Sequence, residues 1–294
     1  MEQIKRYLPV YYTDENTNDY IAYLTDAYLL NTEKELFQFS FLAFHMLFMS
    51  YIYKVIWFLH KHKPEAVASF IRNNHLEDIS HFFQLSIAGE KLALRALTQL
   101  VSHQNTIADF CISVDRRDHC AHASGYIQYS AQKIENFINE ELEHIQKIQP
   151  LLNSYISDLY KHFLYENWNP DERSYSLPQE MIDAFLRAEL LSLEDLLLLT
   201  KVDFSELHEK SNHPKIINIK CLHLSFLYLA QSYLGLEYNL FLSNLSLLMY
   251  GFNEQQELRI SNVILDNFHN IIPTLTDEEL KRFREITKFN IERV

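Results

Sequence analysis

Glycine is scarce in this chain: only four of its 294 residues are glycine, whereas average usage of roughly 7% would give about twenty. Strand-rich folds need glycine in tight turns and bulges, and α/β folds that bind nucleotides need it close to phosphate groups. The shortage of glycine therefore argues against both classes. Hydrophobic residues nevertheless make up 48% of the chain, including 20 Phe and 18 Tyr. A large aromatic core is thus available, and we predict an all-α fold.

Cysteine and basic residues are also few. The three cysteines, Cys111, Cys120 and Cys221, are too scattered for a disulfide framework or a Cys-rich zinc site. Lys and Arg total 26 against 39 Asp and Glu, a net charge of −13, so the chain lacks the global basic field that captures nucleic acid. Any nucleic-acid chemistry must then be confined to a local basic site. The N-terminal segment has no apolar signal-peptide core, and we expect a cytoplasmic location.

One apolar run, residues 36–59, is long enough to span a bilayer. It contains Gln38, His45 and Lys54, whose polar groups are costly in lipid, and no second run of comparable apolarity accompanies it. A helix that is apolar almost all round is typical of a protein core. We therefore predict a buried core helix here and no association with a membrane.

Helix boundaries are marked along the N-terminal half. The capping-box pattern Thr-x-x-Glu at residues 32–35 predicts the start of the long apolar helix, which should end near residue 62. A short helix over residues 64–74 should follow, with proline at its first position. The next predicted helix covers residues 76–103, although Gly89 offers a place to break it.

A less regular stretch at residues 104–115 precedes a very long predicted helix that begins near Asp115 or Asp118. Pro150 lies inside this helix and should kink it or divide it in two. The helix is recognised by apolar residues at steps of three, four and seven, which predict one packing stripe: Ile127, Ile134, Ile138, Leu142, Ile145, Ile148, Leu152, Ile156, Leu159 and Phe163.

Residues 167–178 form the clearest interruption, because they are polar, contain two prolines and lack helical periodicity. We predict two parts, a helical bundle over residues 1–167 and an additional C-terminal helical subdomain over residues 179–294. The second part carries no known motif. Its predicted helices are residues 179–191, a leucine-rich helix capped by Ser192 and Asp195, residues 214–234, 236–250 and 253–270, and a last helix capped at residues 276–279.

The densest cluster of reactive side chains lies at residues 115–126. Within it, Arg117 and His122 are separated by four residues. This spacing resembles the Arg-x4-6-His motif of the HEPN superfamily, small helical bundles that include many metal-independent ribonucleases. Asp118 occupies the position after the arginine, where the family commonly has a polar residue, and Ala121 is the small residue that often precedes the histidine. The resemblance extends at most over residues 18–167.

The resemblance implies an RNA endonuclease with 2′,3′-cyclic phosphate products, acting as a homodimer whose two motifs meet in one composite site. It also implies a toxin–antitoxin or antiviral defence system, with an antitoxin or regulatory protein as partner. In this interpretation Arg117 binds the scissile phosphate, because arginine stays charged and offers a planar fork. His122 transfers protons, because histidine titrates near neutrality. Asp118 orients either Arg117 or His122. Arg116 and Tyr126 bind the substrate.

Two alternatives remain open at this point. His119 and His122 have a helical spacing that suits one metal ion, but a third and fourth ligand are not evident nearby, and we predict no metal and no cofactor. Residues 115–118 also fit a solvated helix start. The chain would then be a non-catalytic helical interaction or adaptor protein whose acidic surface binds a basic partner, and substitution of Arg117 and His122 would leave its function intact.

Overall fold

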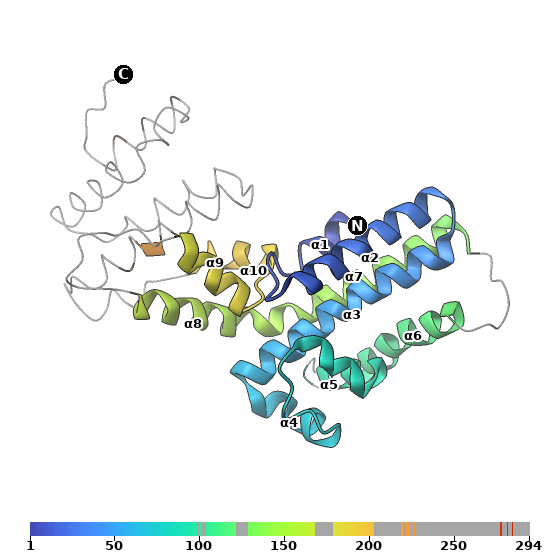
Figure 1. Ribbon diagram of the computed structural model, residues 1–294, viewed down its shortest axis with the longest axis horizontal. Helices are drawn as coiled ribbons and strands as arrows, with labels where there is room; N and C mark the ends of the chain where they lie inside the picture. Colours follow the sequence, from blue (N-terminus) through green and yellow to red (C-terminus); the bar gives the residue numbers. More distant parts are fainter. Residues whose placement is uncertain are drawn as a thin grey trace. The chain divides into compact units, whose positions relative to one another are not determined.

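The computed structural model describes residues 1–98, 100, 104–121, 129–167 and 179–202, and a few isolated positions further on: Ile219, Leu222, His223, Phe226, Asp277, Lys281 and Arg284. Of these described residues 81% are helical and none lies in a strand, which confirms the all-α class. The helices are, in chain order (Figure 1), α1 (Glu2–Lys5), α2 (Glu15–Glu33), α3 (Phe37–His62), α4 (Pro64–Asn73), the 3-10 helix η1 (Phe82–Ala88), α5 (Glu90–Thr98), α6 (Gln104–Ala121), α7 (Ala131–Ile148), α8 (Pro150–Glu166), α9 (Gln179–Ala188) and α10 (Leu193–Leu199).

The chain divides into two compact units. The first contains Met1–Ile156 together with Phe185–Asp195, and the second contains Ser157–Ala184 together with Leu196–Val294. The end of α9 and the start of α10 both belong to the first unit. The chain thus passes between the two units more than once, whereas the sequence predicted a single boundary after residue 167. Residues 168–178, where that boundary was expected, lie outside the described residues, and so do the helices expected after residue 202, apart from the isolated positions named above.

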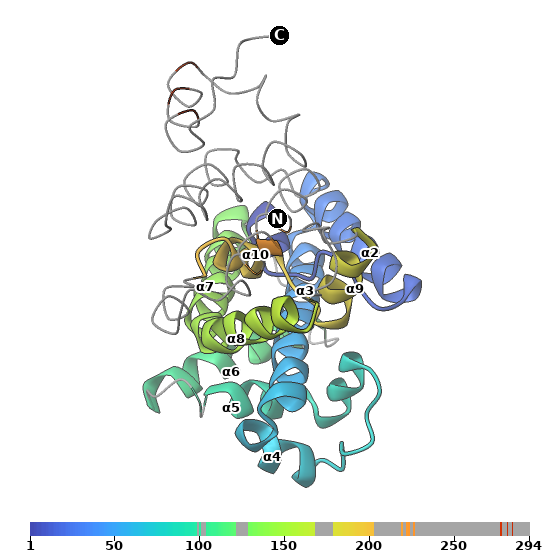
Figure 2. The same cartoon turned by 90° about the vertical axis from the view of Figure 1, so that its left-hand side faces the viewer.

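Helix α3 forms the centre of the first unit. It contacts α2, α4, η1, α5, α6 and α7, and both views show α2 running alongside it (Figures 1 and 2). By length and composition α3 would suffice to cross a membrane, but 83% of its apolar window is buried inside the protein. Aromatic side chains such as Phe44 and Phe48 are completely buried. The segment is thus a mostly buried core helix, as in soluble proteins and as its sequence predicts.

The junction between α2 and α3 differs from the sequence-based prediction. Asp14 caps α2 by accepting a bond of 2.9 Å from the Thr17 amide, and this helix runs on through Thr32 to Glu33. The Thr32 hydroxyl donates to the carbonyl of Tyr28 at 2.7 Å, as a threonine inside a helix often does. Glu35 makes the turn with φ of 57°, and α3 starts without a side-chain cap. The capping box predicted at residues 32–35 is therefore wrong.

Gly89 interrupts the next predicted helix. Instead of one helix over residues 76–103, the chain forms η1 and α5 on either side of this glycine. Gly89 has φ of 82°, a conformation that glycine adopts without the steric strain of other residues. Helix α4 begins at Pro64, as predicted.

Helix α6 begins earlier than the sequence indicates. It covers Gln104–Ala121, so the predicted irregular stretch at residues 104–115 and the predicted start near Asp115 or Asp118 are wrong. Many residues of this stretch are poor helix formers, but Phe110 and Val114 are buried where α6 packs against α3 and α5. Tertiary packing thus overrides the weak helix propensity.

Pro150 divides the predicted long helix, as expected. Helix α7 starts after its cap, Ser130, and Pro150 is the first residue of α8, a position where its missing amide hydrogen costs little. Most of the predicted apolar stripe is buried, whereas Ile127 lies outside the described residues. The buried members are Ile134, Ile138, Leu142, Ile145, Ile148, Leu152 and Ile156.

A confirmed capping box opens α10. The Ser192 amide donates to Asp195 Oδ2 at 2.8 Å, and the Asp195 amide donates to Ser192 Oγ at 3.3 Å. In the second unit, the buried Tyr160 of α8 has its hydroxyl 2.7 Å from Nδ1 of His223, and its ring packs 4.7 Å from that of Phe226.

Candidate active site

The last two turns of α6 carry Arg116, Arg117 and Asp118. His122 and Tyr126, the other two residues of the predicted site, lie outside the described residues. The site can therefore be built only from the α6 side and from the residues that surround it.

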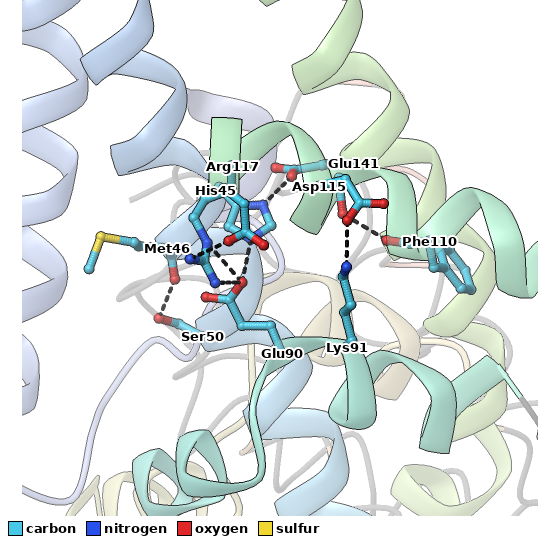
Figure 3. A network of polar contacts seen from close by, with 11 residues as sticks. His45, Met46, Ser50, Glu90, Lys91, Phe110, Asp115, Arg117 and Glu141 are labelled. Atoms are coloured by element: carbon cyan, nitrogen blue, oxygen red, sulfur yellow. Dashed lines mark hydrogen bonds and ion pairs between the residues drawn. The ribbon is translucent and has the colours of Figure 1, made fainter. Parts of the chain in front are cut away.

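Arg117 is bonded to two carboxylates. Its Nε donates to Glu90 Oε2 at 3.0 Å, and its Nη2 donates to the same oxygen. Its Nη1 lies 2.7 Å from Asp118 Oδ1. Three of the five N–H donors of the guanidinium are thus engaged, while the side chain remains 28% exposed. Arg117 is therefore fixed in orientation beside the carboxylate of Glu90 (Figure 3).

Arg116 points to a different neighbour. Its Nη1 bonds Glu140 of α7, and its guanidinium carbon lies 4.2 Å above the ring of Phe137, a cation–π geometry. On the other side, Lys91 of α5 bonds Asp115 (Figure 3). These contacts attach α6 to α5 and α7. Arg116 and Arg117 therefore face different neighbours.

His45 lies behind Glu90 in the core. Its Nδ1 is 2.5 Å from Oε1 of Glu141 on α7, and its Nε2 is 3.2 Å from Oε2 of Glu90, the first residue of α5. The side chains of His45 and Glu141 are completely buried. Glu90 Oε2 therefore accepts from His45 on one side and from Arg117 on the other, which joins α3, α5, α6 and α7 (Figure 3). We call these four residues, together with Asp118, the Arg117 network: His45, Glu90, Arg117, Asp118 and Glu141.

Geometry and charge together favour a protonated His45, even though burial raises the pKa of its partner Glu141. A neutral imidazole donates from only one nitrogen, but both nitrogens of His45 face carboxyl oxygens. Burial by itself lowers the pKa of His45, but Glu141 and Glu90 outweigh it and raise that pKa to about 9. Burial also raises the pKa of Glu90, but its bonds to His45 and Arg117 outweigh this effect, and the net pKa is lowered. Glu90 is thus a carboxylate, and His45 is an imidazolium at neutral pH.

Sequence reasoning missed His45, Glu90 and Glu141 as parts of the site. A signal existed for two of them. His45 interrupts the apolar run of α3, and Glu141 lies beside Leu142 in the apolar stripe of α7. An ionisable residue on a buried face requires a partner of opposite charge. Glu90 gives no such signal, because its position depends on the turn at Gly89 and on the packing of α5.

No protein-family model, curated protein or solved structure matches this chain. Within the part of the chain that the structure describes, no group of three or more His, Cys, Asp or Glu side chains is arranged to hold a metal ion. The alternative of a metal held by His119 and His122 lies partly outside that part, because His122 is not among the described residues. His119 itself is exposed, and its Nδ1 donates to the carbonyl of Asp115 at 2.6 Å.

Proposed function

We propose that the chain is a cytoplasmic, metal-independent RNA endonuclease of the HEPN type that acts as a homodimer in a toxin–antitoxin or antiviral defence system. One observation carries the proposal. Arg117, the first residue of the Arg-x4-His motif, is oriented by Glu90 and Asp118 yet remains partly exposed. A pre-oriented guanidinium stabilises the charge on a phosphate without reorganisation during the reaction.

The proposed reaction needs a base, an acid and a phosphate-binding group. His122 removes the proton from a ribose 2′-hydroxyl, whose oxygen then bonds the adjacent phosphorus. The bond from phosphorus to the 5′-oxygen breaks, and that oxygen takes up a proton from the second histidine of the composite site. Arg117 binds the non-bridging oxygens, Asp118 orients Arg117, and Arg116 and Tyr126 contact the substrate. The products end in a 2′,3′-cyclic phosphate and a 5′-hydroxyl.

The test compares four variants of the purified protein on total RNA in EDTA. We expect His122→Ala to lower cleavage by about 10²–10⁴-fold, the usual contribution of general acid–base catalysis. Arg117→Lys should lower it by about 10²–10³-fold, the usual cost of losing a group that stabilises charge in the transition state. Arg117→Lys retains the positive charge beside Glu90 but not the planar fork. It should therefore reduce cleavage while the protein stays folded. His119→Ala and Arg95→Ala are matched controls, because both residues are exposed and lie on the same or the neighbouring helix. Folded variants with wild-type cleavage would contradict the proposal.

A second function, a non-catalytic adaptor with a basic partner, is favoured by the outer face of α2. At helical steps of three and four it presents acids and large apolar residues that are all exposed. Tyr23 is 68% exposed and Leu30 is 53% exposed. A basic amphipathic helix matches this combination in charge and in apolarity. The residues of this α2 face are Glu15, Asp19, Tyr23, Asp26, Leu30 and Glu33.

The nuclease and adaptor functions depend on different residues, so different substitutions should abolish them. An adaptor should retain its cellular effect in Arg117→Lys and His122→Ala but lose it in a Tyr23→Ser/Leu30→Ser double variant. Leu92→Ser on α5 serves as the control, since Leu92 is 43% exposed and lies outside the α2 face. A nuclease should give the reverse pattern.

A further inference from the structure

The Arg117 network separates into an outer pair and an inner pair. The outer pair is Arg117 with Asp118, which are 28% and 35% exposed. The inner pair is His45 with Glu141, which are completely buried. Glu90 stands between them with 20% of its side chain exposed, and its Oε2 accepts from both sides. The orientation of Glu90 therefore depends on an interior residue that no substrate can reach.

We propose that His45 is a positioning residue for Arg117: its imidazolium orients the Glu90 carboxylate, which in turn fixes the guanidinium that binds phosphate. The inference rests on the proposed function, because the orientation of Arg117 affects catalysis only if Arg117 binds substrate. It adds a residue from α3, far from the motif in sequence, that acts through Glu90 and touches no reacting atom.

The contacts on both sides of Glu90 support this role. Without His45, the bonds of the Glu90 carboxylate within the described residues would be those to Arg117, and both side chains are long and partly exposed. Long side chains lose considerable rotamer freedom when they are held in one geometry. With His45 present, a bond from a completely buried ring restricts Glu90 from the core side. Glu141 provides the same restriction for the ring, since it bonds the opposite nitrogen.

A spectroscopic measurement tests the inference without relying on RNA cleavage. In ¹⁵N-labelled protein, the Nε–H signal of Arg117 is assigned by its loss in Arg117→Lys, and its exchange with water is measured. We expect this hydrogen to exchange slowly in the wild type and about tenfold faster in His45→Gln, because exchange reports the loss of a hydrogen bond. His144→Gln is the matched control: His144 is another buried histidine of the same unit, and its ring packs against those of Phe48 and Phe110.

A second variant protects the test against misfolding. His45→Gln leaves Glu141 as an uncompensated buried charge, which can be strongly destabilising. The double variant His45→Gln/Glu141→Gln removes both charges and keeps hydrogen-bonding groups at both positions. We also expect the wild-type Arg117 Nε chemical shift to follow the titration of His45, a measurement that needs no substitution in the core. An unchanged exchange rate in the double variant, or an Nε shift that does not follow His45, overturns the inference.

RNA cleavage then separates this inference from the proposed function. If the wild-type protein cleaves RNA, both His45 variants should lower kcat/KM by about 10²-fold, the cost of a displacement of roughly 1 Å, while His144→Gln should not. Faster Arg117 exchange in a protein whose wild type cleaves no RNA would refute the nuclease but support the positioning role. Cleavage by the wild type with no change in either His45 variant refutes the positioning role and leaves the nuclease intact.

Discussion

His45 is an ionisable residue with no access to solvent, so its charge depends on Glu90 and Glu141. Its pKa is raised from the ordinary 6.5 to about 9, and the folded state therefore retains a proton that the unfolded chain loses. The resulting stabilisation is fully present below pH 6.5 and is lost as the pH rises to 9. Its upper bound is about 3.5 kcal/mol, since the shift is about 2.5 pKa units and one unit corresponds to about 1.4 kcal/mol.

We therefore expect the wild-type free energy of unfolding, measured by urea denaturation, to decrease from pH 6.5 to pH 9. The decrease should be smaller in His45→Gln/Glu141→Gln. Parallel pH dependences in the two proteins would show that the imidazolium contributes nothing to stability.

His144 is predicted to have the opposite dependence. It is 5% exposed, and its ring meets Phe110 edge-on at 4.1 Å. Burial, aided by Lys147 and Arg116, lowers the pKa of His144 to about 3. The unfolded chain takes up a proton near pH 6.5 that the folded state excludes, so the contribution of His144 is lost as the pH falls from 6.5 to 3. We expect His144→Gln to lose less stability than the wild type between pH 6.5 and pH 4, and an equal loss would contradict the assignment.

At the residue scale, the sequence predicted part of the site. The sequence analysis expected Asp118 to orient either Arg117 or His122, and in the structure Asp118 contacts Arg117. The bonds of Arg117 to Glu90 and of Glu90 to His45 were not expected, because they join residues on three helices. A single sequence shows that the charge of His45 needs compensation in an apolar helix, but it cannot name the acid that provides it.

At the scale of elements, two lysines on α3 provide a matched comparison. Lys54 is 1% exposed and donates to Asp195 Oδ2 at 2.6 Å, whereas Lys61 is 32% exposed and lies 3.2 Å from Glu189. Both pairs connect α3 to the α9–α10 segment. Removal of one partner of a buried ion pair typically costs about 3–5 kcal/mol, whereas a surface pair contributes about 0–1 kcal/mol.

We expect Lys54→Met to lower the urea midpoint strongly and to release residues 185–195 from the first unit, detected as faster amide exchange at Ser192. Lys61→Met should change the midpoint little. Equal effects of the two substitutions would show that burial does not determine the strength of these pairs.

Helix starts illustrate why the elements were only partly predictable. The pattern of a hydroxyl residue followed three positions later by an acid occurs at Ser192–Asp195 and at Thr32–Glu35, but only the first forms a capping box. Asp195 is held there by Lys54 and by Gln149, which donates to its Oδ1 at 2.6 Å. Thr32 instead bonds backward to Tyr28 inside α2. The sequence supplies the local groups, whereas the tertiary partners determine which pattern forms a cap.

At the scale of the whole molecule, the net charge of −13 opposes the binding of RNA. The described part of the site adds little positive charge, because the Arg117 network contains three carboxyl groups beside two cations. A two-fold dimer doubles the number of cations and histidines in one cleft, which is why the nuclease proposal includes a homodimer.

The last prediction concerns this shared cleft. We expect light scattering to show a dimer at micromolar concentration, and we expect activity to require His122 from both protomers. Mixed dimers of one wild-type and one His122→Ala chain, purified with two different tags, distinguish two independent sites from one composite site. If each chain contained a complete site, a mixed dimer would retain half of the wild-type activity. If one composite site uses one histidine as base and the other as acid, cleavage by the mixed dimer should fall by about 10²-fold or more, because one proton transfer is lost. A wild-type/His119→Ala mixed dimer controls for handling and should remain fully active.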